Sequence, residues 1–567
     1  MVNPIATIDQ YVRRSHIAYF SMEIALRSEI HTYSGGLGVL AGDTARSCAD
    51  LEIPAVFVSL VSRAGYLRQT LNEHGDQIDN TDPWDPSVWA EPLGAMVAVQ
   101  IEGRHVWIRA WLYQLSCPLG HGIPVILLDT DLEQNEAEDR LITHHLYGGD
   151  DAYRLKQEIV LGIGGERMLR ALGFEIRTYH LNEGHAALLT LSLLRRYANA
   201  GPDPSSALHY DLDAVKERCV FTTHTPVEAG HDRFDYRLVD RVLGTFVETE
   251  KIRALAGDDS LNMTRLALNL SGYINGVARK HALTANSMFP GYHVHAITNG
   301  IHVPTWAHGS FAGLFQTIIP NWGHEPEWLA RADQLPDKAV WNAHREAKRQ
   351  LLVLVSDRTG VQLDLDVPLL GFARRITGYK RPDLLFSDSG RLSAINRSHP
   401  FQVVFAGKAH PRDAEGKQLI SRIKSHMDAF SGQVAMAFLA DYDLDIARAL
   451  VAGVDVWLNT PLPPMEASGT SGMKAALNGV LNLSSLDGWW VEGCIEGVTG
   501  WAIGREDDPG SMHASLLYDK LERVVLPLYY KDRDRWIWMM KQAISRIASQ
   551  FNSQRMMRRY ATEAYLR

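Results

Sequence analysis

The sequence predicts an α/β fold composed of two Rossmann-like domains. Short apolar segments alternate with longer helical segments along most of the 567 residues, a pattern typical of β–α units whose strands form parallel sheets. The chain is too long for one hydrophobic core, because a single domain usually contains about 100–200 residues. Several polar motifs directly follow apolar segments, and doubly wound sheets bind ligands at the carboxyl ends of their strands.

The expected strands and helices differ in length and in the spacing of their apolar residues. Apolar runs bounded by polar residues or glycine predict strands over residues 55–61, 106–112, 124–129, 220–223, 369–373, 402–406, 434–439 and 454–459. Longer amphipathic segments predict helices over residues 153–172, 186–198, 338–354 and 444–452.

A change in composition after Trp306 marks the expected boundary between the two domains. The segment from there to Pro336 is rich in glycine, proline and tryptophan, so we expect it to be irregular. A long helix is expected to begin near Lys338.

The predicted domains are therefore residues 1–310 and residues 311–540, both Rossmann-like. The amphipathic tail over residues 536–567 is expected to be helical, and residues 541–567 form a separate C-terminal segment.

The overall composition excludes several functional classes. Apolar residues make up 46% of the chain and charged residues 22%, and the formal net charge is −9, so electrostatics favour neither nucleic acid nor an anionic membrane as a partner. The N-terminus has no apolar signal core, and no run of 18 apolar residues suggests a membrane span. The four cysteines lie far apart and form no CxxC pair, which favours a reducing compartment. We therefore expect a cytoplasmic protein.

The most informative segment is 459–492, NTPLPPMEASGTSGMKAALNGVLNLSSLDGWWVE, which follows the last predicted strand. Its prolines exclude regular structure, and its small and hydroxyl residues lead into a helix that Gly479 is expected to end. This arrangement gathers Glu466, a glycine turn and Lys474 at a helix start, which suits an anion such as phosphate. A buried lysine is costly unless it is paired or neutral, and imine formation with an aldehyde cofactor makes it neutral.

Two further motifs suit an anionic ligand. The sequence GGLG, which contains Gly36 and Leu37, precedes a helix, and glycines allow the backbone to approach a phosphate. The sequence FARRITGYKR follows the strand 369–373 and places Arg374, Arg375 and Lys380 near one turn, where they could bind phosphate or carboxylate. A tight structural turn and a solvated basic turn are the alternative interpretations.

Histidines form a third set of candidate residues. His185 and His224 each follow an apolar strand segment, so they could be core residues, ligand contacts or metal ligands. Five more histidines are available for a metal: His144, His145, His293, His295 and His302. No HExxH or comparable spacing occurs, so we expect no metal.

Three further residue types are ambiguous without additional information. Asn299 in TNG could be a plain turn residue and Trp306 a core aromatic residue. Glu466 could pair with Asp487 or Glu492 as in a glycosidase, but a simple hydrolase has no use for the lysine and arginine cluster. The adjacent tryptophans at 489 and 490 are expected to pack in the core rather than to stack on a sugar.

The signature EASGT–x–x–MK, followed by LNG and LDG, closely resembles the cofactor-lysine segment of the glycogen and α-glucan phosphorylases. Those enzymes hold pyridoxal 5′-phosphate as an imine on the lysine that matches Lys474. GGLG also matches a family loop. Tyr33 and Ser34 precede it, where bacterial glycogen and starch synthases carry a lysine and a threonine, and this difference favours phosphorylase.

The resemblance implies roles for the other motifs. Arg375 and Lys380 match residues that hold the substrate phosphate, while Arg374 replaces a family lysine that meets the cofactor phosphate; arginine keeps the charge but changes the geometry. The implied catalytic residues are Lys474, Arg374, Arg375 and Lys380. The implied cofactor contacts are Lys474, Thr470, Ser471, Gly36, Arg374 and Trp306. The implied substrate contacts are Gly36, Leu37, His185, His224, Asn299, Tyr379, Glu466, Ser468 and Gly469.

The resemblance further implies a short-form phosphorylase with GT-B architecture, in which two Rossmann-like domains face an interdomain cleft and a C-terminal helix crosses back to the first. The implied reaction is reversible phosphorolysis of an α-1,4-glucan to α-glucose 1-phosphate with retention. Its partners are the glucan and inorganic phosphate, and a homodimer is compatible with it. Two alternatives remain open: a nucleotide-sugar glucosyltransferase on the same fold, or an inactive glucan-binding protein.

Overall fold

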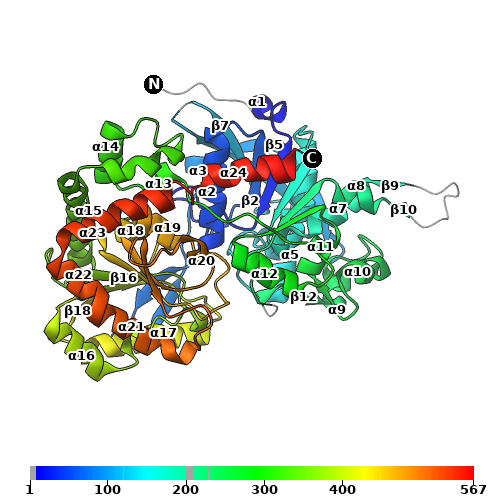
Figure 1. Ribbon diagram of the computed structural model, residues 1–567. Helices are drawn as coiled ribbons and strands as arrows, with labels where there is room; N and C mark the ends of the chain where they lie inside the picture. Colours follow the sequence, from blue (N-terminus) through cyan, green and yellow to red (C-terminus); the bar gives the residue numbers. More distant parts are fainter. Residues whose placement is uncertain (1–7, 119, 200–208, 228–229, 567) are drawn as a thin grey trace.

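The computed structural model describes residues 8–118, 120–199, 209–227 and 230–566. Two large sheets organise these residues. The first has nine strands in the order β15-β14-β11-β8-β1-β2-β7-β6-β5, and the second has six in the order β18-β17-β16-β19-β20-β21. Figure 1 shows the first sheet with its helices in blue to green and the second in yellow to orange.

The first sheet is mostly parallel. Its strands are β1 Ile17–Ser21, β2 Ala55–Leu60, β5 Glu91–Ile101, β6 Arg104–Ser116, β7 Gly122–Asp129, β8 Thr178–Asn182, β11 Cys219–Thr222, β14 Tyr273–Gly276 and β15 His295–Ala296. The expectation of parallel pairing is wrong at one edge, where β6 pairs antiparallel with both β5 and β7. For β5 and β6 the reason is the two-residue turn Glu102-Gly103, with φ of 51° and 76°, which makes a hairpin; a parallel connection needs a long crossover, and the short link from Ser116 to Gly122 is likewise too short for one.

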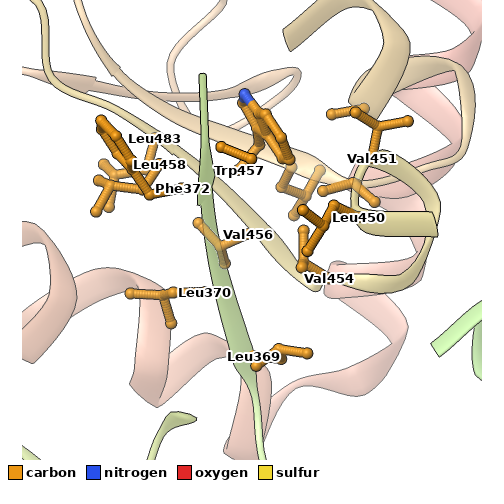
Figure 2. Packing of buried hydrophobic residues seen from close by; sticks show 14 of the residues in the cluster. Leu369, Leu370, Phe372, Leu450, Val451, Val454, Val456, Trp457, Leu458 and Leu483 are labelled. Atoms are coloured by element: carbon orange, nitrogen blue, oxygen red, sulfur yellow. The ribbon is translucent and has the colours of Figure 1, made fainter. Parts of the chain in front are cut away.

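The second sheet is parallel throughout. Its strands are β16 Leu369–Ala373, β17 Gln402–Ala406, β18 Ala435–Leu439, β19 Val456–Asn459, β20 Leu481–Ser485 and β21 Gly500–Ile503. The helices in its crossovers include α16 Ser389–Ser398, α17 Ala414–Ala429, α18 Leu444–Gly453 and α19 Ser471–Leu477. Figure 2 shows apolar side chains of β16, β19 and α18 packed together, which explains why these strands read as unbroken apolar runs.

The four predicted helices are confirmed. Residues 153–172 form α5 Asp151–Ile159, a π-helical turn Val160–Gly164 and α6 Gly165–Ala171. The others are α7 Leu188–Arg196, α15 Asp337–Thr359 and α18. The helix that follows the GGLG motif is α2 Gly36–Asp50.

The expectation of an irregular segment before Pro336 is wrong. It contains α14 Gly309–Ile318 and a 3₁₀ helix, Pro326–Gln334. His308 caps α14 by accepting a hydrogen bond from the Ser310 N–H at 3.2 Å. Phe311 and Phe315 lie one turn apart and are both buried in the core of the second sheet, which stabilises the helix despite its glycines.

The remaining elements are short. The helices are α1 Asp9–Val12, α3 Pro86–Trp89, α4 Ala137–Arg140, α8 Leu212–Lys216, α9 Tyr236–Val242, α10 Thr249–Ala256, α11 Met263–Asn269, α12 Arg279–Met288, α13 Val303–Trp306, α20 Trp490–Gly493, α21 His513–Lys520 and α22 Leu526–Lys531. Three two-stranded sheets pair β3 Arg68–Leu71 with β4 Gln77–Asn80, β9 Ala198–Asn199 with β10 His209–Tyr210, and β12 Arg233–Asp235 with β13 Ser260–Asn262. Within the described ranges, no helix combines the length and the apolar character that crossing a membrane requires.

The C-terminal residues are helical, as expected for the described part of 536–567. They comprise α23 Arg533–Ala543, a π-helical turn Ile544–Ala548, α24 Ser553–Tyr560 and a π-helical turn Ala561–Tyr565. The Tyr560 hydroxyl lies 3.1 Å from Thr222 Oγ1 and 2.9 Å from Asn275 Nδ2, both in the first sheet. Although α24 follows the second sheet in sequence, it therefore packs on the first, where Figure 1 shows it in red.

A backbone seam joins the C-terminal region to the loop after β15. The Ile301 N–H donates to the Phe551 carbonyl at 3.1 Å, and the Ser553 N–H donates to the Ile301 carbonyl at 2.8 Å. A Cβ on Gly300 would lie 2.2 Å from the Asn552 carbonyl, so only glycine permits this approach. The loop that carries Asn299 is thus fixed by residues about 250 positions further along the chain.

Candidate functional site

The candidate residues lie mainly on loops that follow parallel strands. Residues 374–381 follow β16, residues 460–470 follow β19, and the histidine segments follow β8 and β11. Since parallel strands end at the same edge of a sheet, each sheet collects its loops along one edge. The structure thereby brings residues of the predicted site together, as the contacts below show.

A buried cationic cluster surrounds Glu466. Arg374 Nη2 and Lys380 Nζ each lie 2.7 Å from Glu466 Oε2, and Arg374 also donates to Asn459 Oδ1. Burial alone would raise the pKa of Glu466, but the adjacent charges of Arg374 and Lys380 outweigh it and lower the pKa to about 2. Glu466 is therefore a carboxylate at every physiological pH.

Four candidate residues carry a buried polar atom that no described residue satisfies. They are Arg374 Nε, Ser468 Oγ, Asn299 Oδ1 and His185 Nδ1. Leaving such an atom without a partner costs about 1–3 kcal/mol. Because all four were predicted from sequence as ligand contacts, their unused bonding capacity fits a polar ligand.

Arg375 differs from the other two cations after β16. Its side chain is exposed and makes no hydrogen bond or ion pair with any described residue. The charged and phenolic groups that act on it electrostatically are Tyr379, Tyr66, Glu23 and Tyr147. The Lys380 ammonium also lies 4.8 Å from the centre of the Tyr379 ring, so Tyr379 borders both cations. Arg375 is consequently available to an incoming anion without first losing a partner.

Lys474 lies in the middle of the seven-residue helix α19 and is only 7% exposed. In the described part of the chain its ammonium has no hydrogen-bond or ion-pair partner, and it lies 3.8 Å from the centre of the Trp306 ring. Burial lowers the pKa of Lys474 to about 8, although the Asp43 carboxylate opposes this shift. A larger fraction of the side chain is therefore a neutral, nucleophilic amine near neutral pH than for an exposed lysine.

Asp43 in α2 positions the tryptophan beside Lys474. The Trp306 Nε1–H lies 3.1 Å and 2.9 Å from the two Asp43 carboxylate oxygens, and Asp43 is 2% exposed. Sequence reasoning missed this residue. The available signal was an acidic residue within the otherwise apolar stretch VLAGDTA, directly after GGLG.

The glycine loop presents its backbone to open space. An added Cβ at Gly35 or Gly36 would meet no atom within 4 Å. The Gly36 and Leu37 N–H groups lie in the first turn of α2, where no helical acceptor exists, and no described residue accepts from them. The loop can therefore donate hydrogen bonds to a ligand.

Glu23, which sequence reasoning also missed, fixes the conformation of this loop. Its carboxylate accepts from the Ser34 N–H at 2.6 Å, the Gly35 N–H at 3.1 Å and the Tyr147 hydroxyl at 2.9 Å. A Cβ at Gly38 would lie 2.6 Å from Glu23 Oε2. Gly38 is thus needed for packing, whereas Gly36 is not.

Both candidate histidines are held neutral. His224 Nε2 lies 2.6 Å from Asn182 Oδ1, and the backbone N–H of His224 donates to Glu183 Oε2 at 2.7 Å. His185 Nε2 lies 3.4 Å from Asp232 Oδ2. Burial lowers the pKa of each histidine to about 3. The three acceptors were missed because each is distant in sequence from the histidine that it contacts.

The contacts of these residues also bear on the metal-site, glycosidase and sugar-stacking interpretations. Across the described residues, no three histidine, cysteine or acidic side chains group as metal ligands would, and His302 instead pairs with Asp50 at 2.8 Å. Asp487 accepts the Glu466 N–H at 2.8 Å, so it supports that loop rather than facing Glu466 as a second catalytic carboxylate. The tryptophans at 489 and 490 are buried, which confirms that they pack in the core.

In the turn that leads into α19, some hydroxyl groups already make hydrogen bonds within the protein. Ser471 Oγ accepts from Trp457 Nε1 at 3.1 Å, and Thr470 makes no side-chain cap bond. Gly469 has φ of 84°, a left-handed conformation that favours glycine, and this brings it against Glu466. At this helix start, the hydroxyls of Ser468 and Thr470 therefore remain for a ligand, and the Ser471 hydroxyl can still donate a hydrogen bond.

Taken together, these features define an α/β protein with parallel sheets, a buried cationic cluster and a buried lysine that has no polar partner among the described residues. The chain belongs to the carbohydrate phosphorylase family, whose model matches residues 227–499. It is 38% identical to the maltodextrin phosphorylase of Thermococcus litoralis, with 97% of this chain and 70% of that protein aligned. It is 34% identical to the glycogen phosphorylase of Aquifex aeolicus, with 97% and 86% aligned, and 36% identical to that of Mycobacterium bovis, with 97% and 70% aligned.

Proposed function

We propose that the protein is an α-1,4-glucan phosphorylase. It would convert a glucan and inorganic phosphate reversibly into a shortened glucan and α-glucose 1-phosphate, with retention of configuration. The observation that carries this proposal is the buried Lys474, which has no polar partner among the described residues and lies on the helix that follows the loop carrying Glu466 and its two cations. Relatives named maltodextrin phosphorylase and glycogen phosphorylase support it.

The same proposal includes the GT-B architecture. The first domain would span residues 1–310, the second 311–540, and the segment 541–567 would return to the first. Strands of the nine-stranded sheet come from residues 17–296 and those of the six-stranded sheet from 369–503, which supports this division. The hydrogen bonds of Tyr560 to Thr222 and Asn275 support the return of the C-terminal segment.

The residues present fit pyridoxal 5′-phosphate. Lys474 would hold its aldehyde carbon, and Trp306 would pack beside that lysine. Arg374, whose Nε has no partner among the described residues, would face the cofactor phosphate together with Thr470, Ser471 and the Gly36 N–H. When bound, the cofactor supplies a phosphate group that supports proton transfer to and from the substrate phosphate.

Arg375 and Lys380 would hold the substrate phosphate. Two phosphates in contact repel strongly at low dielectric, and the nearby cations offset this repulsion. An incoming phosphate would compete with Glu466 for Lys380 and Arg374, which now share that carboxylate. Binding of phosphate and release of Glu466 toward the sugar would then be coupled.

The sugar would be held by neutral groups. His224 and His185 do not ionise near neutral pH, so they can bind hydroxyl groups without attracting anions. Asn299 and Ser468 each have an unused oxygen. The remaining contacts would come from Leu37, Tyr379, Glu466 and Gly469.

Closure of the two domains would exclude water and favour phosphorolysis over hydrolysis. A cytoplasmic location and a homodimer remain predictions.

The decisive experiment incubates the purified protein with maltooligosaccharides and phosphate, with and without pyridoxal 5′-phosphate. We expect glucose 1-phosphate from the loaded protein and none from Lys474→Ala. Borohydride treatment followed by mass spectrometry should locate a cofactor adduct on Lys474. An active preparation without adduct or cofactor absorbance would instead support a nucleotide-sugar glucosyltransferase, and sugar binding without product would support a glucan-binding protein.

A further inference from the structure

The β3–β4 hairpin lies in sequence between β2 and β5 of the first sheet, but it packs against the second sheet. Its two faces differ, because side chains alternate along a strand. The outer face carries the exposed Thr70 and Ile78, which are paired across the hairpin. The inner face carries Leu71, which contacts the core of the second sheet, and two glutamines, Gln69 and Gln77, which are only 2% and 8% exposed.

Both buried glutamines bond to the backbone of loops that follow strands of the second sheet. Gln77 Oε1 accepts from the Ala409 N–H at 2.9 Å, and Gln77 Nε2 donates to the Ala409 carbonyl at 2.9 Å. Gln69 Nε2 donates to the Gly407 carbonyl at 2.9 Å, and Gln69 Oε1 accepts from the Asp441 N–H at 2.9 Å. A further hydrogen bond of 2.8 Å joins Gln69 Nε2 to Gln77 Oε1. Since each amide uses both its oxygen and its nitrogen, the pair fixes the loop after β17 relative to the hairpin.

The loop after β17 in turn holds the cationic loop after β16. The Arg374 N–H donates to the Ala406 carbonyl at 3.2 Å. The Ile376 N–H donates to the Lys408 carbonyl at 2.9 Å. Arg375 therefore lies between two residues whose backbone is bonded to the loop that the glutamines fix.

The segment that leads into the hairpin also approaches Arg375. Burial raises the pKa of the Tyr66 phenol and the charge of Arg375 opposes this rise, so the two groups are close enough to interact electrostatically. The Tyr66 ring centre lies 6.0 Å from that of His410, which follows the loop after β17. Lys408 Nζ donates to the Leu67 carbonyl at 2.9 Å. The hairpin and the two loops thus form one connected unit.

We propose that Gln69 and Gln77 are positioning residues for phosphate binding, because they determine where the loop that carries Arg375 lies. This inference rests on the proposed function, in which Arg375 and Lys380 hold the substrate phosphate. No described hydrogen bond joins either glutamine to those cations, so the effect passes through the backbone of the two loops. Hydrogen bonds from a guanidinium group to phosphate depend on alignment. Displacement of the loop should therefore weaken phosphate binding, whereas most of the proposed sugar contacts lie on other loops.

Calorimetric titration of the protein loaded with pyridoxal 5′-phosphate tests this proposal, with inorganic phosphate and a maltooligosaccharide as probes. Gln77→Met and Gln69→Met keep nearly the same length of side chain but remove the amide. Each should raise the dissociation constant for phosphate about tenfold, as loss of one charge-assisted contact does, and that for the maltooligosaccharide less than about twofold. Thr70→Val, on the outer face of the same hairpin, is the matched control and should change neither constant.

A double variant tests whether the glutamine acts through Arg375. In an Arg375→Ala background, Gln77→Met should weaken phosphate binding much less than it does in the wild type, because the side chain that it positions is already absent. The full tenfold effect in that background would mean that the two residues act independently and would overturn the proposal.

Thermal unfolding of each variant checks that it is folded. Ser421→Ala provides a milder variant, because it removes only the hydroxyl that donates to Asp76 at the tip of the hairpin at 2.7 Å. It should weaken phosphate binding about twofold, and this result decides the proposal if neither glutamine variant folds.

Three results would overturn the proposal: unchanged phosphate binding in the folded variants, equal weakening for both probes, or no phosphate binding by the wild type. The proposed function is judged separately, by the formation of glucose 1-phosphate. A wild-type protein that binds phosphate without forming this product would contradict the proposed function, while the dissociation constants would still decide the role of the glutamines.

Discussion

At the scale of single residues, Lys474 illustrates how burial changes the chemistry of a side chain. Its ordinary pKa is 10.5, and burial lowers it to about 8 in the folded protein. Removing a proton therefore becomes easier in the folded state than in the unfolded state. In the cofactor-free protein, this group makes folding less favourable below pH 8, and stability is regained as the pH rises from about 8 toward 10.5.

The first prediction concerns the pH dependence of cofactor attachment. Only the neutral amine attacks an aldehyde, so the rate of borohydride-trapped adduct formation on Lys474 should rise with pH and level off above about pH 8. Mass spectrometry of the Lys474 peptide at each pH measures this rate. A rate that continued to rise up to pH 10.5 would mean that the lysine is not desolvated.

Asp43 gives a second prediction. Asp43→Asn keeps an oxygen that accepts from the Trp306 indole but removes the negative charge that raises the pKa of Lys474. The midpoint of adduct formation should therefore move to lower pH, while tryptophan fluorescence stays unchanged. Trp306→Phe is the matched control, since it removes the N–H donor and leaves the Asp43 charge. An unchanged midpoint in Asp43→Asn would show that the carboxylate only orients the ring.

Lys380 gives a third prediction. Lys380→Ala should raise the KM for phosphate at least about tenfold and the KM for glucan far less, because the lost group is a cation that faces an anion. Steady-state kinetics with each substrate varied in turn separates the two constants. Lys338→Ala, at an exposed lysine, should change neither. Equal increases for both substrates would contradict the assigned role.

The candidate residues differ in how far sequence could identify them. Arg374, Lys380 and Glu466 lie in compact motifs after strands, and the structure brings these three together. Asp43 and Glu23 are single acidic residues that no recognisable motif surrounds. The residues that they contact lie on other elements of the fold. Sequence spacing contains no information about such pairs, because only the fold brings them into contact.

At the scale of elements, the central strands could be predicted almost to the residue. The predicted bounds of β16 and β17 equal the observed bounds, because a strand buried on both faces is a continuous apolar run. The β5–β6 hairpin could not be predicted in the same way. Its two-residue turn, Glu102-Gly103, is a weak signal between apolar runs that also resemble parallel strands.

The glycine loop gives a fourth prediction, with substitutions at Gly36 and Gly38 as a matched pair. Gly38→Ala places a methyl group against Glu23 and should lower the free energy of unfolding by about 1–3 kcal/mol, as overpacking does. Gly36→Ala enters open space, so its stability should be unchanged while phosphate binding weakens. Urea unfolding and phosphate titration measure the two effects. Loss of stability in Gly36→Ala would mean that this space is filled in solution.

At the scale of the whole molecule, the packing of α24 on the first sheet was not derivable from sequence patterns. The Tyr560 hydroxyl bonds to Thr222 and Asn275, which precede it by 338 and 285 positions. Amphipathicity indicated that the tail is a helix, but not which surface it covers. The resemblance to known enzymes suggested the first domain, and these contacts agree with that surface.

The fifth prediction tests this packing. Tyr560→Phe removes the hydroxyl from buried Thr222 and Asn275 and should lower the free energy of unfolding by about 1–3 kcal/mol. Tyr530→Phe is the control, because that hydroxyl bonds only to the exposed Pro400 carbonyl and should matter much less. Thermal or urea unfolding compares the two. Equal effects would imply that the Tyr560 contacts contribute little.

The seam between Ile301 and Ser553 has a consequence for handling the protein. A protease that nicks the chain between Ser549 and Asn552 would leave all the candidate residues intact and still attached to their own strands. The loop that carries Asn299 would nevertheless no longer be fixed by the backbone hydrogen bonds of Ile301 to Phe551 and Ser553. The Asn299 amide could then move away from the position in which it would bind a sugar. Clipped material would then look whole on a native gel while having lost its affinity for glucan.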